Sequence, residues 1–225
     1  PPASLRRTSF RLLCALALAS VLPSLAFALG QERFVTFAPD AQSAALVAGG
    51  AAAPLLVDPA DWPGVRRAVG DLQADVERVS GLKPVVRSAD GTTAQFAVIV
   101  GTVGRSPLID GLAKAGKIDV SGIAGRWEAF LLQTVERPLP GVERALVIAG
   151  SDKRGTIYGV YELSEQIGVS PWYWWADVPT VHRDTVHVRP VRLVDDGPTV
   201  RYRGIFLNDE APAHSGWAQE KFGGI

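Results

Sequence analysis

Cysteine, histidine and methionine are scarce in this chain of 225 residues, which contains one Cys, three His and no Met. A single cysteine excludes a disulfide framework and a cysteine-based zinc site. His182, His187 and His214 have neither the H-x-H nor the H-x-x-x-H spacing of a metal site, so we expect no metal. Net charge is also absent, because 23 basic residues balance 23 acidic ones, and this argues against a nucleic-acid partner.

The apolar run near the start, from Leu12 to Leu22, is too short for a membrane helix, which needs about 20 residues. Three arginines precede the run, Pro23 ends it, and a small-residue cleavage pattern follows at 26–28. This arrangement is typical of a secretory signal peptide. We therefore expect residues 1–28 to be removed, and the mature protein to be secreted or periplasmic and not held at a membrane.

Residues 29–197 read as an N-terminal α/β domain in which a mixed sheet is covered by helices. Between Val65 and Val79 the apolar residues recur at steps of four and three, which predicts one helical face. Asp58 or Asp61 is the expected cap of that helix. We expect strands at 33–37, 54–57, 96–100, 127–135, 145–149 and 186–194, and helices at 61–80, 107–114 and from 151 to 167.

Two motifs in this domain have competing interpretations. Gly150 and Gly155 have the spacing of a phosphate loop, but Thr156 stands where that loop needs a lysine, so a capped strand-to-helix turn is favoured. The aromatic stretch 172–175 (Trp-Tyr-Trp-Trp) is either a wedge of core between two domains or a platform on which sugar rings stack.

Asn208, Asp209 and Glu210 follow an apolar run, 200–207, that we expect to form a strand. Acids at the carboxyl end of a strand occupy the position where a β/α barrel keeps its chemistry. Glycoside hydrolysis needs two carboxyl groups, but neighbours on an extended strand point to opposite faces, so these two acids do not form such a pair alone. A polar turn with a helix cap remains the alternative.

Three stretches of the sequence resemble glycoside hydrolase family 115, the xylan α-glucuronidases. They are GSDKRGTIYGVYE (150–162), SPWYWWADVP (170–179) and RGIFLNDEAP (203–212), the last continued by SGW (215–217). The resemblance extends from about residue 33 to the end. It implies an α/β domain similar to the second domain of β-hexosaminidases, followed by a catalytic (β/α)8 barrel.

The resemblance also implies an activity and a site. Family members release glucuronic acid or its 4-O-methyl form from α-1,2 links on xylan, with inversion and without a cofactor. Asp209 is the best candidate for the catalytic site, as acid, base or substrate ligand, and Asn208, Glu210 and Trp217 are candidate substrate-binding residues. The expected partner is a polysaccharide, glucuronoxylan, while the oligomeric state stays open.

A β/α barrel takes about 250 residues, so residues 198–225 are expected to be only the truncated start of one. We therefore expect this chain alone to be inactive, with the strand at 200–207 poorly supported. Two alternatives remain: a non-catalytic carbohydrate-binding module that uses the 172–175 stretch, and another uronidase or hexosaminidase specificity on the same scaffold.

Overall fold

The computed structural model describes residues 32–204, 206 and 213–223. The elements lie in one unit, Phe34–Ile225; of the unit before it, Pro1–Arg33, only residues 32 and 33 are described. In chain order they are β1 (Val35–Thr36), β2 (Ala44–Ala48), β3 (Ala51–Ala52), β4 (Leu55–Val57), α2 (Pro63–Ser80), β5 (Val86–Arg87), β6 (Ala94–Thr102), α3 (Pro107–Lys114), β7 (Phe130–Leu139), β8 (Val142–Gly150), α4 (Lys153–Gln166), α5 (Tyr173–Ala176), β9 (Val186–Val188), β10 (Arg192–Asp195) and α6 (Ala213–Phe222).

The larger sheet has six strands in the order β10-β7-β8-β6-β4-β5. The pairs β8–β6, β6–β4 and β4–β5 are parallel, whereas β10–β7 and β7–β8 are antiparallel. The hairpin between β7 and β8 turns at Pro140-Gly141, where Gly141 has a φ of 83°. The mixed sheet expected from the sequence is thereby confirmed.

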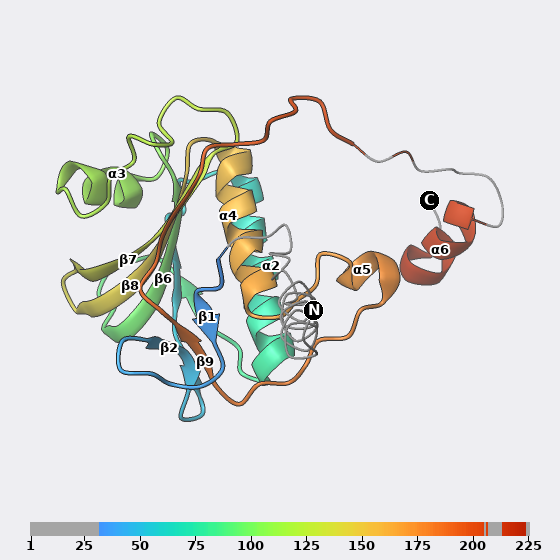
Figure 1. Ribbon diagram of the computed structural model, residues 1–225, viewed down its shortest axis with the longest axis horizontal. Helices are drawn as coiled ribbons and strands as arrows, with labels where there is room; N and C mark the ends of the chain where they lie inside the picture. Colours follow the sequence, from blue (N-terminus) through green and yellow to red (C-terminus); the bar gives the residue numbers. More distant parts are fainter. Residues whose placement is uncertain (1–31, 205, 207–212, 224–225) are drawn as a thin grey trace, which may run out of the picture. The chain divides into compact units, whose positions relative to one another are not determined.

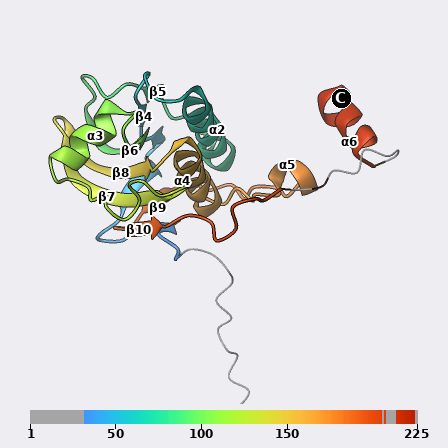
Figure 2. The ribbon, with the colours of Figure 1, turned by 90° about the horizontal axis from the view of Figure 1, so that it is seen from above.

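Helices cover both faces of this sheet, α2 and α4 on one side and α3 on the other (Figures 1 and 2). The central strands are apolar over most of their length because both of their faces are buried there. On β6, Val98 and Val100 pack with the α2–α4 side, while Ala97 and Ile99 pack with α3. The faces of α2 and α4 that point away from the sheet are therefore available for other contacts.

Helix α2 follows the predicted apolar stripe, whose valines and Leu72 are buried against the sheet. Gly81, in the left-handed conformation, ends it as predicted. The expected cap is wrong: Trp62 is the N-cap residue, and no side chain caps the helix. The Asp61 carboxylate is buried and instead accepts hydrogen bonds from the backbone N and the hydroxyl of Thr102 on β6, at 2.8 and 2.9 Å.

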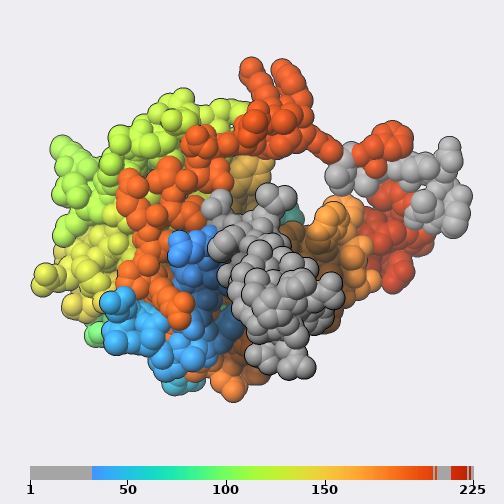
Figure 3. Space-filling view, viewed as in Figure 1, coloured from blue at the N-terminus to red at the C-terminus, as the bar shows by residue number. Residues whose placement is uncertain are grey.

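The single strand expected at 186–194 is in fact two strands in two sheets. β9 joins a small antiparallel sheet of order β1-β9-β2-β3, whereas β10 pairs with β7 in the large sheet. Pro190 lies between them and has no N–H to donate, so a continuous ladder is interrupted there. Figure 3 shows this stretch (orange) crossing the surface between the two sheets.

Two other strand boundaries also differ from expectation. β7 begins at Phe130 and not at Trp127, because Glu128 has a φ of 56°, which a strand does not accommodate. The described residues of the stretch 200–207, which are 200–204 and 206, are not in a strand. Among the described residues, no strand is paired with that stretch, and a strand without a partner lacks its hydrogen bonds. No helix in the described part of the chain has both the length and the apolar character to cross a membrane.

Candidate functional site

The turn at 150–156 is built by packing and capping. The Asp152 carboxylate caps α4 by accepting a hydrogen bond from the Gly155 backbone N at 2.8 Å. A β-carbon on Gly155 would lie 2.1 Å from the Ala129 carbonyl oxygen, and one on Gly150 would lie 2.1 Å from the Thr156 nitrogen. The Thr156 hydroxyl is buried against that of Thr102, at 2.8 Å. These contacts confirm a capped turn that fits α4 closely onto the sheet.

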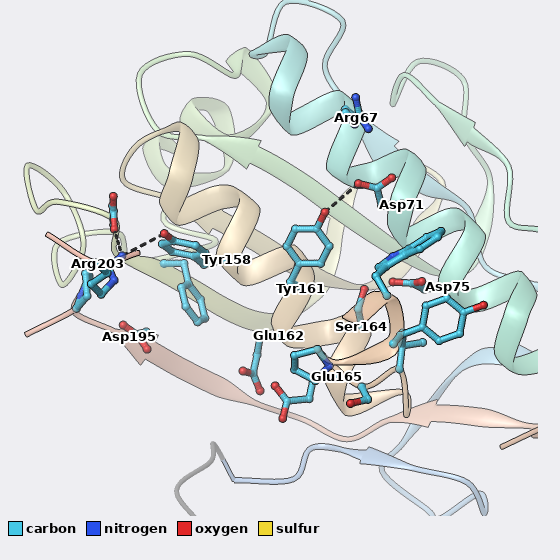
Figure 4. Close-up of a pocket in the computed structure, with 18 of the residues that line it drawn as sticks. Arg67, Asp71, Asp75, Tyr158, Tyr161, Glu162, Ser164, Glu165, Asp195 and Arg203 are labelled. Atoms are coloured by element: carbon cyan, nitrogen blue, oxygen red, sulfur yellow. Dashed lines mark hydrogen bonds and ion pairs between the residues drawn. The ribbon is translucent and has the colours of Figure 1, made fainter. Parts of the chain in front are cut away.

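A groove of about 1050 Å³ lies along α2 and α4 and reaches Phe130 of β7 and Asp195 of β10 (Figure 4). Helix α2 contributes Arg67, Asp71, Ala74, Asp75 and Arg78. Helix α4 contributes Tyr158, Tyr161, Glu162, Ser164 and Glu165. The rest of the lining comes from two later segments and from Glu128 and Phe130; the segments contribute Val169, Ser170, Pro171, Tyr173, Trp174, Asp195, Gly197, Pro198, Thr199 and Arg203. Residues that are far apart in the sequence therefore line the same groove.

Six carboxylates and three arginines line the groove. Burial raises the pKa of two of these carboxyl groups. Burial raises the pKa of Asp75, although Arg78 pairs with it and opposes the shift. Burial also raises the pKa of Glu162, and the charges of Glu165 and Asp195 add to this. Such carboxyls hold protons more readily than exposed ones, which suits acid or base chemistry and hydrogen bonds to hydroxyl groups.

Tyrosine rings form part of the apolar lining, beside Phe130 and Trp174. The Tyr161 hydroxyl donates to Asp71 at 2.9 Å, and burial with this bond raises the pKa of Tyr161 to about 12. The Arg78 guanidinium lies 4.3 Å from the centre of the Tyr173 ring. Tyr161 therefore stays protonated at neutral pH, and the groove presents both flat rings and fixed polar atoms, the combination that sugar sites use.

One end of the groove is closed by a buried ion pair. The Glu128 carboxylate, whose side chain is fully buried, pairs with Arg203 and with Arg154, the latter at 2.7 Å. Arg203 also donates to the Tyr158 hydroxyl at 3.1 Å. The hydrogen bond to Glu128 raises the pKa of Arg203 above its ordinary value. Arg203, from the segment after β10, is thereby attached to the domain.

The aromatic stretch 172–175 is mostly exposed in the described chain. Trp172, Trp174 and Trp175 are 63%, 62% and 47% exposed. Tyr173 is the exception, since it packs against the helical side of the core. The tryptophans are therefore not part of the core of this domain, and the choice between an interdomain wedge and a sugar platform stays open.

Trp217, a predicted substrate-binding residue, lies on α6 and stacks on Trp175, with ring centres 5.0 Å apart. Lys221, one turn further along α6, pairs with Asp177 at 2.9 Å. Asn208, Asp209 and Glu210 lie outside the described residues, so their predicted roles remain predictions.

Sequence reasoning missed the groove itself. Its polar side chains recur on α2 at Arg67, Asp71, Asp75 and Arg78, in steps of four, four and three. These residues form the polar stripe of α2, opposite its apolar stripe. The sequence therefore indicated a polar helix face, but it did not indicate a groove. That a second helix and two loops face it depends on tertiary structure.

The histidines are placed apart from the groove. His187 is buried in β9, His182 pairs with Asp184 at 3.3 Å, and His214 stacks on Trp217. Within residues 32–204, 206 and 213–223, no three His, Cys, Asp or Glu side chains gather closely enough to hold a metal ion.

Comparison with known proteins gives two findings that agree. The sequence profile named Glycosyl hydrolase family 115 matches residues 195–225. A solved structure described as a novel family GH115 4-O-methyl-α-glucuronidase, BtGH115A, with specificity for decorated arabinogalactans, is similar to this chain, with 34% identity and a TM-score of 0.65. The alignment covers 79% of this chain and 21% of that one, so this chain spans about a fifth of that protein's length.

A second structure, of CpGH84D, aligns with 7% identity and a TM-score of 0.41, over 72% of this chain and 23% of its own. No curated protein matches the sequence.

Proposed function

This chain belongs to glycosyl hydrolase family 115, and we propose that the protein containing it releases glucuronic acid, or its 4-O-methyl form, from a decorated polysaccharide. The observation that carries the proposal is the 34% identity over 79% of the chain to an α-glucuronidase of this family. The profile match at 195–225 supports it independently, because it includes the stretch with Asn208, Asp209 and Glu210. The polysaccharide is xylan by the sequence resemblance, whereas the similar structure acts on arabinogalactans.

The proposed mechanism is inverting hydrolysis by two carboxyl groups, one protonating the leaving oxygen and one activating water. Asp209 contributes to this site as a catalytic carboxyl or as a contact to the uronic acid. Asn208, Glu210 and Trp217 contact the sugar. We further propose that residues 1–28 direct the protein out of the cytoplasm, where such polysaccharides are met.

The test uses the whole protein that contains this chain. It is incubated with 4-O-methylglucuronoxylan, with a glucuronic-acid-decorated arabinogalactan and with xylan that carries no uronic acid, and released acids are separated by anion-exchange chromatography. Release from either decorated polymer supports the proposal, and the faster polymer identifies the backbone. Release from neither would refute it.

A matched pair of variants tests Asp209. Asp209→Asn is expected to lower kcat/KM by about 100-fold or more, since proton transfer by a placed carboxyl contributes at least that much. Asp90→Asn changes an exposed acid on the loop after β5 and should leave kcat/KM unchanged. Equal activity in both variants would remove Asp209 from the site. We also expect the 225-residue chain alone to release no uronic acid.

A second candidate function, non-catalytic polysaccharide binding, is favoured by the exposure of Trp172 and Trp174. Affinity electrophoresis on glucuronoxylan tests it. Retardation that is lost in Trp172→Ala or Trp174→Ala, with an unchanged circular dichroism spectrum, would support binding through the aromatic stretch.

A further inference from the structure

The segment 195–204 lies against one loop of the domain, residues 126–128. At the segment's start, Asp196 pairs with Arg126 at 3.3 Å. A β-carbon on Gly197 would lie 2.3 Å from the Trp127 carbonyl oxygen, so the two backbones are in close contact. At its end, Arg203 reaches Glu128, and its guanidinium carbon lies 5.4 Å from the Trp127 ring centre. The segment therefore contacts the loop near its start and at its end, whereas Val200 and Tyr202 between these points are exposed.

Glu128 is the buried centre of this contact. Its carboxylate is paired on one oxygen with Arg154 of α4 and on the other with Arg203 of the segment. Its backbone has a φ of 56°, a conformation that costs free energy for any residue but glycine. Such a conformation persists only where its surroundings enforce it. The Asp152 carboxylate does so, accepting a hydrogen bond from the Glu128 backbone N at 3.0 Å.

The pairing with Arg203 differs from a surface ion pair because its carboxylate is buried, although the Arg203 side chain is 35% exposed. Removing one partner of a buried pair leaves a charge without compensation, which is strongly unfavourable. If Arg203 moved away, Glu128 would keep only Arg154, whose side chain is 58% exposed. Arg203 is thus held by a carboxylate that is buried while the pair is formed.

We propose that Glu128 is a positioning residue: by holding Arg203, it fixes the segment that leads into Asn208, Asp209 and Glu210. Asn208 comes five positions after Arg203 in the sequence, and five residues of chain span at most about 18 Å. Fixing Arg203 thereby fixes the point from which the chain continues toward these residues. The proposal rests on the proposed function only for its effect on catalysis, and its effect on the segment stands apart from it.

The first experiment measures hydrogen exchange by mass spectrometry in the whole protein. At position 128 of Glu128→Gln, and at Ala129 and Gly197, the hydrogen-bonded amides are expected to exchange about tenfold faster than in the wild type, because the charge that holds the segment against this loop is gone. Arg203→Gln should give the same increase; its side chain is 35% exposed, so the domain is expected to stay folded. Glu136→Gln, which breaks the Glu136–Arg144 pair between β7 and β8, is the matched control and should change nothing in this segment.

The second experiment measures kcat and KM of the same variants on the decorated polysaccharide. Misplacement of reacting groups lowers kcat, and we expect a decrease of about tenfold with KM changed less than threefold. The double variant Glu128→Gln with Arg203→Gln should be no slower than either single variant, since the two residues act as one unit. A residue needed only for stability would lower the melting temperature and leave kcat of the folded protein unchanged.

Three outcomes would overturn the proposal: unchanged exchange at the amides of 128, 129 and 197 in both single variants, unchanged kcat in both, or effects that add in the double variant. If the wild-type protein releases no uronic acid, the proposed function fails. The exchange experiment then still decides whether Glu128 holds the segment.

Discussion

The stretches 150–162 and 170–179 resemble the same family, yet their surroundings differ. In the first, Gly155 and Gly159 are buried where α4 meets the sheet, and a β-carbon on either would lie within 2.7 Å of a neighbouring atom. In the second, Trp172 and Trp174 are more than half exposed. The requirements of the fold account for the first stretch and leave the tryptophans of the second unexplained. A motif that packing does not explain is the better guide to function.

The largest expected effect is a difference in the free energy of unfolding between substitutions at a tightly packed glycine and at a glycine with open space around it. Gly155→Ala should lower the free energy of unfolding by about 3 kcal/mol, because its β-carbon would collide with the rigid Ala129 carbonyl and α4 would have to move. Gly70→Ala, on the exposed side of α2 with open space around it, should raise it by about 0.5–1 kcal/mol. Urea unfolding of both variants measures the difference, and equal effects would remove the packing explanation.

A smaller effect is expected at Glu162, where the first stretch faces the groove. Burial raises the pKa of this carboxyl above 4.5, so the folded state binds the proton more tightly than the unfolded state. The contribution of the protonated Glu162 carboxyl to the free energy of unfolding is then fully present below pH 4.5. It is lost as the pH rises through the folded-state pKa. Glu162→Gln should therefore be more stable than the parent at pH 7 by up to about 0.5 kcal/mol, and equally stable at pH 4.

Thermal melts at the two pH values check this sign. The amide can still accept the hydrogen bond from Gln166, so packing is little changed. Glu143→Gln, an exposed acid on β8, should show no such pH dependence. A variant that is less stable than the parent at pH 7 would contradict the assigned direction.

The smallest effect on stability is expected in the second stretch. Trp172→Ala should change the free energy of unfolding of this chain by less than about 0.5 kcal/mol, because the side chain is 63% exposed and leaves no cavity. In the whole protein the same change should lower activity or sugar binding if this surface has a function there. A large loss of stability in the 225-residue chain would mean that the tryptophan belongs to the core after all.

The elements that the sequence predicted best are those whose signal is local. The stripe from Val65 to Val79 defines α2, and Asp152 before α4 is a cap that can be read without the fold. The hairpin β2–β3 was missed because it is built largely from alanine and turns at Gly49-Gly50, so neither β-branched residues nor alternation mark it.

The site was less predictable because its members come from distant parts of the chain. Glu128 lies in what reads as the start of a strand, and its burial depends on Arg203, 75 residues later. Ion pairs of this kind leave no periodic pattern. The resemblance directed attention to Asp209, whereas the groove and its raised carboxyl pKa values follow only from the way α2 and α4 pack.

The division of 186–195 between two sheets has a consequence for the order of folding. Val35 pairs with Val188, 153 residues further along, so the first strand has no partner until nearly the whole domain has been made. At about 5–20 residues per second, synthesis of that interval takes about 8–30 s. During this time β1 and β2 have exposed edges. Contacts so distant in sequence also slow refolding, so the small sheet is expected to form last and to be the part of the domain most dependent on the completion of its C-terminal strands.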